Sequence, residues 1–226
     1  MQIVKPIDKL IHWLESELTH FVSLVEEGSV AAGDPWQEGF SDHDLQIIVS
    51  QDETQETQAI REYLNLNMLG NEYLVTVRLL ENYLKGQDSL NDISLKFRAT
   101  TLSGQNVIED KALPDMGIAL KIGQDGLDNL VGRLERRWLN LTHWDNKYAQ
   151  HKNYGIYKNF YVYYSALHYG KTGYYPASRA EASSLLPNAD LADNLLSVTN
   201  DIGNSTKDAQ GLAITSAIQL ITEIRN

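Results

Sequence analysis

Residues 26–45 read EEGSVAAGDPWQEGFSDHDL, and this stretch holds the most informative pattern of the chain. Gly28 and Ser29 are small residues that we expect to form a turn after a helix. Without bulky side chains, the backbone N–H groups of such a turn can approach a phosphate, and the Ser29 hydroxyl adds another donor. The first part of the stretch therefore predicts a phosphate-binding turn at Gly28 and Ser29.

The second part of the stretch carries two carboxylates, Asp42 and Asp44, two residues apart. The β-branched run that follows predicts a strand over residues 44–50. Residues two apart in a strand share a face, so the carboxylates repel each other unless a cation lies between them, while His43 points to the opposite face. Mg²⁺ prefers oxygen ligands of this kind and completes its shell with phosphates and water. The stretch thus predicts a Mg²⁺ site beside a phosphate-binding turn, as phosphoryl or nucleotidyl transfer requires.

Outward from this stretch, the N-terminal half mixes helix and strand patterns. Apolar residues at spacings of three and four predict a helix over residues 6–25. A run rich in Glu and Gln predicts an exposed helix over residues 51–66, and β-branched and aromatic residues predict a strand over residues 72–80. Residues 92–101 and 106–109 are further candidate strands. The N-terminal half is therefore predicted to be α/β.

The C-terminal half is predicted to be helical, because strand signals fade after the glycine-rich residues 123–126. Apolar and aromatic residues then recur at helical spacing over residues 127–150, 154–169, 178–186, 190–200 and 208–224. We therefore predict an α+β fold in which a mixed sheet with helices, residues 1–124, is followed by an all-α helical bundle, residues 125–226.

The charge and composition narrow the classes of function. The chain has 226 residues with 19 Lys+Arg against 30 Asp+Glu, a net charge of −11, and no cysteine. This balance argues against a nucleic-acid partner and favours metal ions and cationic small molecules. The lack of cysteine excludes disulfides, thiolate metal sites and a cysteine nucleophile. No signal-peptide pattern and no stretch approaching ~20 apolar residues is visible, so we expect a cytoplasmic protein without a membrane partner.

Two motifs carry a resemblance to a known family. Gly28-Ser29, Gly33 and Ser41-Asp42-x-Asp44, followed by an apolar strand, resemble the signature of the DNA polymerase β-like nucleotidyltransferase superfamily. Residues 163–182 are similar to the helix, Thr-Gly turn, basic residue and Ala-rich helix of the aminoglycoside and lincosamide nucleotidyltransferases. Those enzymes join an N-terminal nucleotidyltransferase domain to a C-terminal helical domain, which agrees with the division predicted at residues 124 and 125.

The resemblance implies a reaction and its cofactors. Asp42 and Asp44 would hold Mg²⁺ against the triphosphate of ATP or another NTP, and Gly28 and Ser29 would cradle the β- and γ-phosphates. A hydroxyl of a small molecule, such as an aminoglycoside or lincosamide antibiotic, would attack the α-phosphorus and release pyrophosphate. Through the same resemblance, Lys158 and Arg179 become candidates for phosphate contact.

The sequence departs from the family at the third carboxylate, which serves as general base or metal ligand. Matching residues 76–86 to the related strand puts Thr76 or Leu74 where the acid is expected. Glu72, on the same predicted strand, and Asp92, at the head of the next candidate strand, are the catalytic candidates that remain. General-base catalysis contributes about 10²–10⁴-fold to a rate, so losing it would leave a nucleotide- or ligand-binding relative without turnover.

Other interpretations stay open at this point. A toxin-type nucleotidyltransferase that modifies a macromolecule shares the same active-site motif. Asp42 and Asp44 alone could lie in a solvated turn, and Trp36 could either pack or stack on a substrate ring. The tyrosines between residues 157 and 175 are expected mainly in the core, because they recur at helical spacing.

Overall fold

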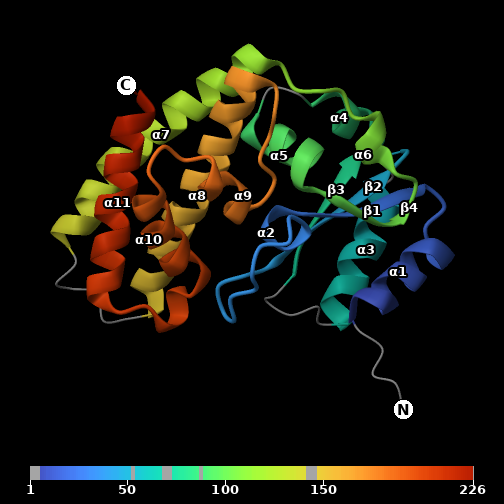
Figure 1. Cartoon of the computed structure of the whole chain (residues 1–226). Coiled ribbons are helices and arrows are strands. Elements are labelled where there is room, and N and C mark those ends of the chain that lie inside the picture. The colour runs from blue at the N-terminus through green and yellow to red at the C-terminus, as the bar shows by residue number, and fades with distance from the viewer. Residues whose placement is uncertain (1–5, 52–53, 68–72, 87–88, 141–146, 226) are drawn as a thin grey trace.

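The computed structural model describes residues 6–51, 54–67, 73–86, 89–140 and 147–225 (Figure 1). In its N-terminal half the elements are α1 (Pro6–Glu17), β1 (Phe21–Glu27), α2 (Gly28–Ala31), β2 (His43–Val49), α3 (Thr54–Asn67), β3 (Tyr73–Leu79), α4 (Leu80–Lys85), α5 (Leu90–Arg98), β4 (Thr100–Gly104) and α6 (Val107–Asp110). The predicted helix over residues 51–66 and the strands over residues 44–50 and 72–80 are confirmed as α3, β2 and β3.

The sheet is mixed, with strand order β3-β2-β1-β4. β1 pairs antiparallel with both β2 and β4, and β2 pairs parallel with β3. Apolar side chains of α1 and α3 cover one face of this sheet, and those of α4, α5 and α6 cover the other. Together with the helical C-terminal half, this arrangement confirms the predicted α+β class.

The helix predicted over residues 6–25 is wrong beyond Glu17, because residues 21–27 form β1. β1 is an inner strand that is bonded on both edges and covered on both faces. Its middle residues, 22–26, are consequently all buried. A strand buried on both faces reads as a continuous apolar run, which also satisfies a helical spacing of three and four.

The strands considered for residues 92–101 and 106–109 are also wrong, since most of these residues form α5 and α6. The Ser89 hydroxyl caps α5 by accepting a hydrogen bond from the backbone N–H of Asp92 at 3.1 Å. Such a cap satisfies a donor that the first turn of a helix leaves unpaired. The strand of this region is β4, which begins only at Thr100.

The C-terminal half consists of long helices packed side by side (Figure 1). They are α7 (Met116–Leu139), α8 (Lys147–Thr172), α9 (Arg179–Ser184), α10 (Ala189–Asn200) and α11 (Lys207–Arg225). The predicted helical bundle is thus confirmed, and its core contains the buried aromatic side chains Tyr157, Phe160, Tyr161 and Tyr164. Residues 141–146, within the helix predicted for 127–150, lie outside the described part.

The glycine-rich residues 123–126 do not separate two elements, because α7 continues through them. Gly123 and Gly126 are buried where α7 packs against α8. A Cβ atom at Gly123 would lie 2.5 Å from the backbone nitrogen of Leu167. These glycines therefore allow two helix backbones to approach closely, and the predicted division at residues 124 and 125 falls inside α7. The division into two domains stays a prediction.

Replacing Gly123 by alanine is expected to destabilise the protein by about 1–3 kcal/mol, because the added methyl group meets backbone that cannot rotate away. Gly155→Ala in α8 is the matched control, since nothing described lies within 4 Å of its added Cβ. That control should gain about 0.5–1 kcal/mol from helix propensity. Urea denaturation of both variants measures the difference, and equal stabilities would contradict the close helix contact.

Candidate active site

The stretch of residues 26–45 connects two neighbouring antiparallel strands, and Glu27 at the end of β1 lies opposite Asp44 in β2. Gly28 and Ser29 follow a strand directly, not a helix as predicted, and they begin the short helix α2. Gly28 has φ of 82°, and a Cβ there would lie 2.8 Å from Oδ2 of Asp44. Glycine thus permits both the backbone conformation and the close approach of the Asp44 carboxylate.

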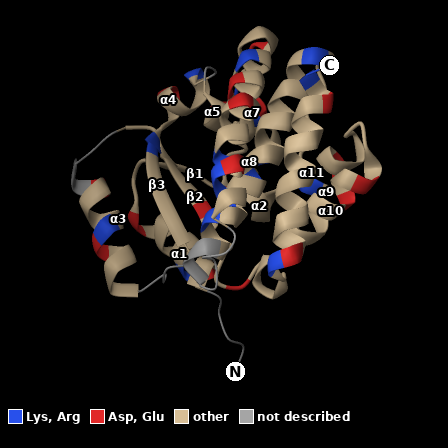
Figure 2. Ribbon diagram, turned by 90° about the vertical axis from the view of Figure 1, so that its left-hand side faces the viewer, with Lys and Arg blue, Asp and Glu red and all other residues tan. Residues whose placement is uncertain are grey.

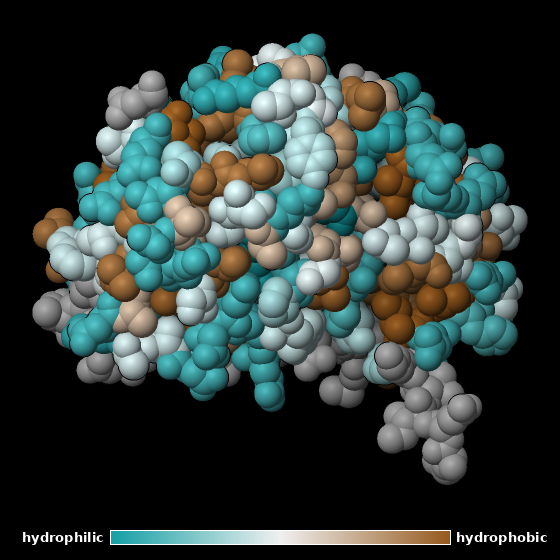
Figure 3. All heavy atoms as spheres, in the orientation of Figure 1, coloured by the Kyte–Doolittle hydropathy of each residue, from teal (hydrophilic) through white to brown (hydrophobic). Residues whose placement is uncertain are grey.

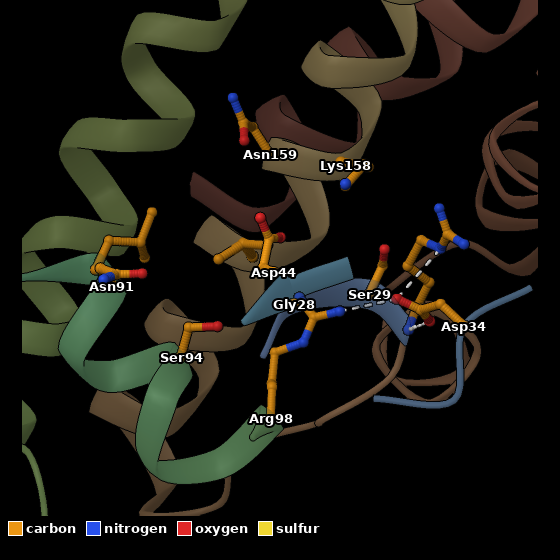
Figure 4. A pocket seen from close by; sticks show the side chains of 12 residues that line it. Gly28, Ser29, Asp34, Asp44, Asn91, Ser94, Arg98, Lys158 and Asn159 are labelled. Carbon is orange, nitrogen blue, oxygen red and sulfur yellow. Dashed lines mark hydrogen bonds and ion pairs between the residues drawn. The ribbon is translucent and has the colours of Figure 1, made fainter. Parts of the chain in front are cut away.

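A pocket of about 380 Å³ lies between this end of the sheet and the helices α5, α8 and α9 (Figure 4). The sheet end contributes Gly28, Ser29, Asp34 and Asp44 to its wall; α5 contributes Leu90, Asn91, Ser94 and Arg98; the C-terminal half contributes Lys158, Asn159, Val162 and Arg179. The pocket therefore contains three of the four residues predicted to bind phosphate and metal, together with both predicted phosphate contacts.

Asp44 is one of two carboxylates that line this pocket, the other being Asp34, and the pKa of Asp44 is raised to about 6. Burial is the main cause, and the negative charges of Asp42 and Glu26 add to it. Lys158 and His43 act in the opposite direction. Asp42 directly precedes β2 and is partly buried. The carboxylates of Asp42 and Asp44 are therefore close enough to repel each other, as their spacing predicted.

His43 lies on the other face of the sheet, as the strand period predicts. Its Nδ1 is 2.5 Å from Oε1 of Glu26, and its ring stacks at 4.9 Å on Tyr73. Trp36 packs on the same imidazole, with 5.1 Å between ring centroids, and keeps 42% of its surface exposed. The packing interpretation of Trp36 is thus observed, and His43 is engaged away from the pocket.

The pocket wall also carries three cationic side chains, Arg98, Lys158 and Arg179. Lys158 extends from α8 over the ring of Tyr154, with its Nζ 5.3 Å from the ring centroid. Arg98 and Arg179 are almost completely buried and both contact Asp34. Figure 2 shows the acidic end of the strands in red and the basic residues of the neighbouring α8 in blue. Such a pairing of carboxylate and cations suits a ligand that carries phosphates and a divalent metal ion.

Of the two predicted base candidates, only Asp92 is described, and it is not among the residues that line the pocket. Glu72 lies outside the described residues. Asp92 lies in the first turn of α5, where its Oδ1 is 3.7 Å from Arg78 and 3.6 Å from the buried Lys111. These ion pairs hold the Asp92 side chain, while Asn91 beside it lines the pocket. The catalytic role of both acids stays a prediction.

The positions flanking Asp44 show how this chain departs from the three-carboxylate pattern. On one side, Leu74 of β3 lies opposite Asp44 and is 61% exposed. Thr76 lies opposite Gln46, one step further along the strand. On the other side stands Glu27, whose pKa is raised mainly by burial, against the lowering effect of its hydrogen bond from Gln46. The nearest cross-strand acid therefore comes from β1 and not from β3.

The donor set around Asp44 fits a metal ion that is shared with a substrate. Within the described ranges, no three Asp, Glu or His side chains come together closely enough to hold a metal ion. Asp42 and Asp44 supply hard oxygen atoms next to an open pocket, and their repulsion favours a cation. Phosphate oxygens and water would complete the shell of a Mg²⁺ ion at these two residues.

Sequence reasoning missed several residues of the pocket, among them Asp34, Asn91, Ser94, Arg98 and Asn159. Residues 92–101 were a candidate strand, so the helix face that Asn91, Ser94 and Arg98 share was not visible. Asp34 lies in the stretch quoted at the outset, but its partners are 64 and 145 positions away. A capping pattern at Ser89 was the one local signal that could have placed α5.

Comparisons with known proteins add a structural relative. No protein-family model matches the sequence, and no curated protein matches it. The structure is similar to that of the spectinomycin adenyltransferase AAD(9) from Enterococcus faecialis, determined with ATP and spectinomycin, with a TM-score of 0.57. This chain shares the fold of that enzyme. The similarity covers 98% of both chains at 11% sequence identity, so it includes the sheet and the helical half alike and establishes the fold alone.

No helix among the described residues is both long and apolar enough to span a membrane. On the face seen in Figure 3, hydrophobic residues lie among hydrophilic ones over most of the surface and gather in a patch at the lower right.

The raised pKa of Asp44 predicts a pH-dependent effect of Asp44→Asn. Between the ordinary pKa of 3.8 and about 6, the folded chain keeps a proton that the unfolded chain releases, so stability decreases as pH rises through this window. Without metal and nucleotide, Asp44→Asn should therefore melt higher than wild type above pH ~6, with the difference shrinking towards pH ~4. Thermal unfolding across this range measures it, and a pH-independent difference would contradict the burial of Asp44.

Proposed function

We propose that this protein is a Mg²⁺-dependent nucleotidyltransferase that moves a nucleoside monophosphate from ATP, or another NTP, to a hydroxyl of a small molecule. One observation carries the proposal: the Gly28-Ser29 turn, the carboxylate of Asp44 and the cations Arg98, Lys158 and Arg179 all face one pocket. The adenyltransferase fold of the whole chain supports it. We further propose that the protein acts in the cytoplasm.

Each side of the pocket has a part in the reaction. Asp42 and Asp44 would hold Mg²⁺, which neutralises phosphate charge and stabilises the charge of the leaving pyrophosphate when it is bound. Backbone N–H groups at Gly28 and Ser29 donate hydrogen bonds to phosphate oxygens, since no side chain hinders their approach. Lys158 balances the negative charge from the opposite wall.

The acceptor hydroxyl attacks the α-phosphorus in line with the leaving pyrophosphate, so the P–O bond to the β-phosphate breaks as the new P–O bond forms. The hydroxyl proton passes to a base, for which Glu72 and Asp92 are the candidates that the sequence provides. The acidity around residues 26–44, which contain six carboxylates and no Lys or Arg, favours a cationic acceptor such as an aminoglycoside.

A second candidate function is nucleotide or ligand binding without turnover. The observation that favours it is Leu74 opposite Asp44, at a position where the related enzymes place a carboxylate. Such a protein would bind Mg²⁺ and ATP in the same pocket but form no nucleotidylated product.

Incubation with Mg²⁺, ATP labelled at the α-phosphate, and panels of aminoglycosides, lincosamides and other polyols tests both functions. We expect transfer of label to at least one cationic acceptor, with release of pyrophosphate, and strongly reduced transfer by Asp44→Asn. Nucleotide binding without product on any acceptor would favour the binding protein. Absence of both binding and product in a folded protein would contradict the shared site.

A further inference from the structure

The inference concerns Asp34 and the two arginines that it holds at the pocket wall. Asp34 lies in the loop that follows α2, and its side chain is 1% exposed. Its Oδ2 accepts a hydrogen bond of 2.8 Å from Arg98 of α5 and lies 3.4 Å from Nε of Arg179. Its Oδ1 accepts a hydrogen bond of 2.7 Å from the backbone N–H of Arg179, the first residue of α9. One carboxylate thus joins the sheet end, α5 and the C-terminal half.

The charges of this triad do not cancel. A single carboxylate stands against two guanidinium groups, which leaves a surplus of one positive charge in a nearly buried environment. Among the described residues, the buried Nε atoms of Arg98 and Arg179 both lack a hydrogen-bond partner. A buried, incompletely paired charge is costly unless a ligand compensates it. Because both arginines line the pocket, that compensation is available from an anion inside it.

The arginines are also fixed in orientation. Arg179 donates from Nη1 to the hydroxyl of Tyr154 and from Nη2 to the carbonyl of Pro35, both at 3.2 Å. The conformational entropy of a long side chain is therefore lost on folding and need not be lost again when a ligand binds. Figure 4 shows Arg98 and Asp34 next to Ser29, with dashed lines marking the contacts of Asp34.

We propose that Asp34 is a positioning residue, which holds Arg98 and Arg179 as a prearranged binding site for the phosphate tail of the nucleotide. The proposal rests on the proposed function for the identity of the ligand, a triphosphate. It adds that Arg98 of the sheet-containing half and Arg179 of the helical half bind the triphosphate together. It also adds that Asp34, although negatively charged, increases the affinity of the pocket for this anion. Affinity increases because the gain from holding the two guanidinium groups in place is larger than the loss from neutralising one positive charge.

Binding of inorganic tripolyphosphate, measured by titration calorimetry with and without Mg²⁺, tests the proposal without requiring turnover. Arg98→Gln leaves a balanced Asp34–Arg179 pair and should weaken binding about tenfold or more, because one charge-assisted contact is lost. Arg133→Gln removes the same charge from an exposed position of α7 and should change binding less than about twofold. Unchanged affinity in Arg98→Gln would overturn the phosphate site.

Asp34→Asn separates the effect of orientation from that of charge. It removes one negative charge, so the site becomes more positive, and it also removes the ion pairs that hold Arg98 and Arg179. We expect weaker tripolyphosphate binding, whereas attraction by net charge alone predicts tighter binding. Equal or tighter binding by a folded Asp34→Asn protein would overturn the positioning role. If that variant does not fold, Asp34→Glu keeps the charge and displaces both guanidinium groups. It should also bind more weakly, and wild-type affinity would overturn the role in the same way.

The proposed function and the positioning role of Asp34 can be contradicted independently of each other. If no acceptor is nucleotidylated but tripolyphosphate binding depends on Arg98 and Asp34, the proposed function fails and the anion site stands. If nucleotidyl transfer occurs and its KM for ATP is the same in wild type and Arg98→Gln, the inference fails alone. A KM effect without a matching kcat effect is the result that positioning of a bound phosphate tail predicts.

Discussion

Asp44→Asn is expected to lower nucleotidyl transfer by about 10²–10³-fold, the size found when a group that stabilises developing charge is removed. Asp44 lines the pocket, and its carboxylate lies against Gly28. Its backbone position is fixed by the pairing of β2 with β1. The amide keeps this shape but supplies no negative charge to a divalent cation. The loss should therefore appear in kcat, while the fold is retained.

Asp193→Asn on α10 provides the control, because it removes one exposed carboxylate away from the pocket. It should transfer label at the wild-type rate. Binding of Mn²⁺, followed by electron paramagnetic resonance in the presence of ATP, should be weakened in Asp44→Asn and unchanged in Asp193→Asn. Full activity of Asp44→Asn would contradict both the metal site and the proposed reaction.

Leu74→Glu is expected to raise the rate of transfer, by about 10²-fold if the new carboxylate acts fully as a general base. Leu74 lies opposite Asp44 in the parallel pair of β2 and β3, and its side chain is already 61% exposed. A glutamate there can extend towards the pocket without leaving an internal cavity. Like charges opposite each other destabilise a sheet, so the variant should melt lower than wild type unless a divalent cation is present.

Leu66→Glu adds the same charge at an 81% exposed position near the end of α3 and should leave the rate unchanged. Single-turnover assays with labelled ATP compare the two variants with wild type. An unchanged rate in Leu74→Glu would indicate that another acid already accepts the proton. Turnover gained only in Leu74→Glu would identify the wild-type chain as the binding protein.

Local patterns were sufficient for the parts of this fold whose neighbours in sequence are also neighbours in space. The spacing of Asp42 and Asp44 and the position of His43 on the opposite face follow from the geometry of a strand. The helices α10 and α11 were predicted to within a few residues for the same reason. In each of these helices the apolar residues recur at helical spacing, so they form one stripe along the helix.

The α+β class and the position of Asp42 and Asp44 at the start of β2 could be predicted from the sequence, because strand and helix patterns repeat within a few residues. Phosphate binding at Gly28 and Ser29 stays a prediction. The sequence did not show that residues 21–27 are an inner strand. Burial on both faces of the sheet removes the alternation of apolar and polar residues by which a strand is told from a helix. Only the tertiary structure decided that Asp34 meets Arg98 and Arg179, from 64 and 145 positions away. Ion pairs over such distances have no periodicity in sequence, and they form only when the packed helices bring their partners to one pocket.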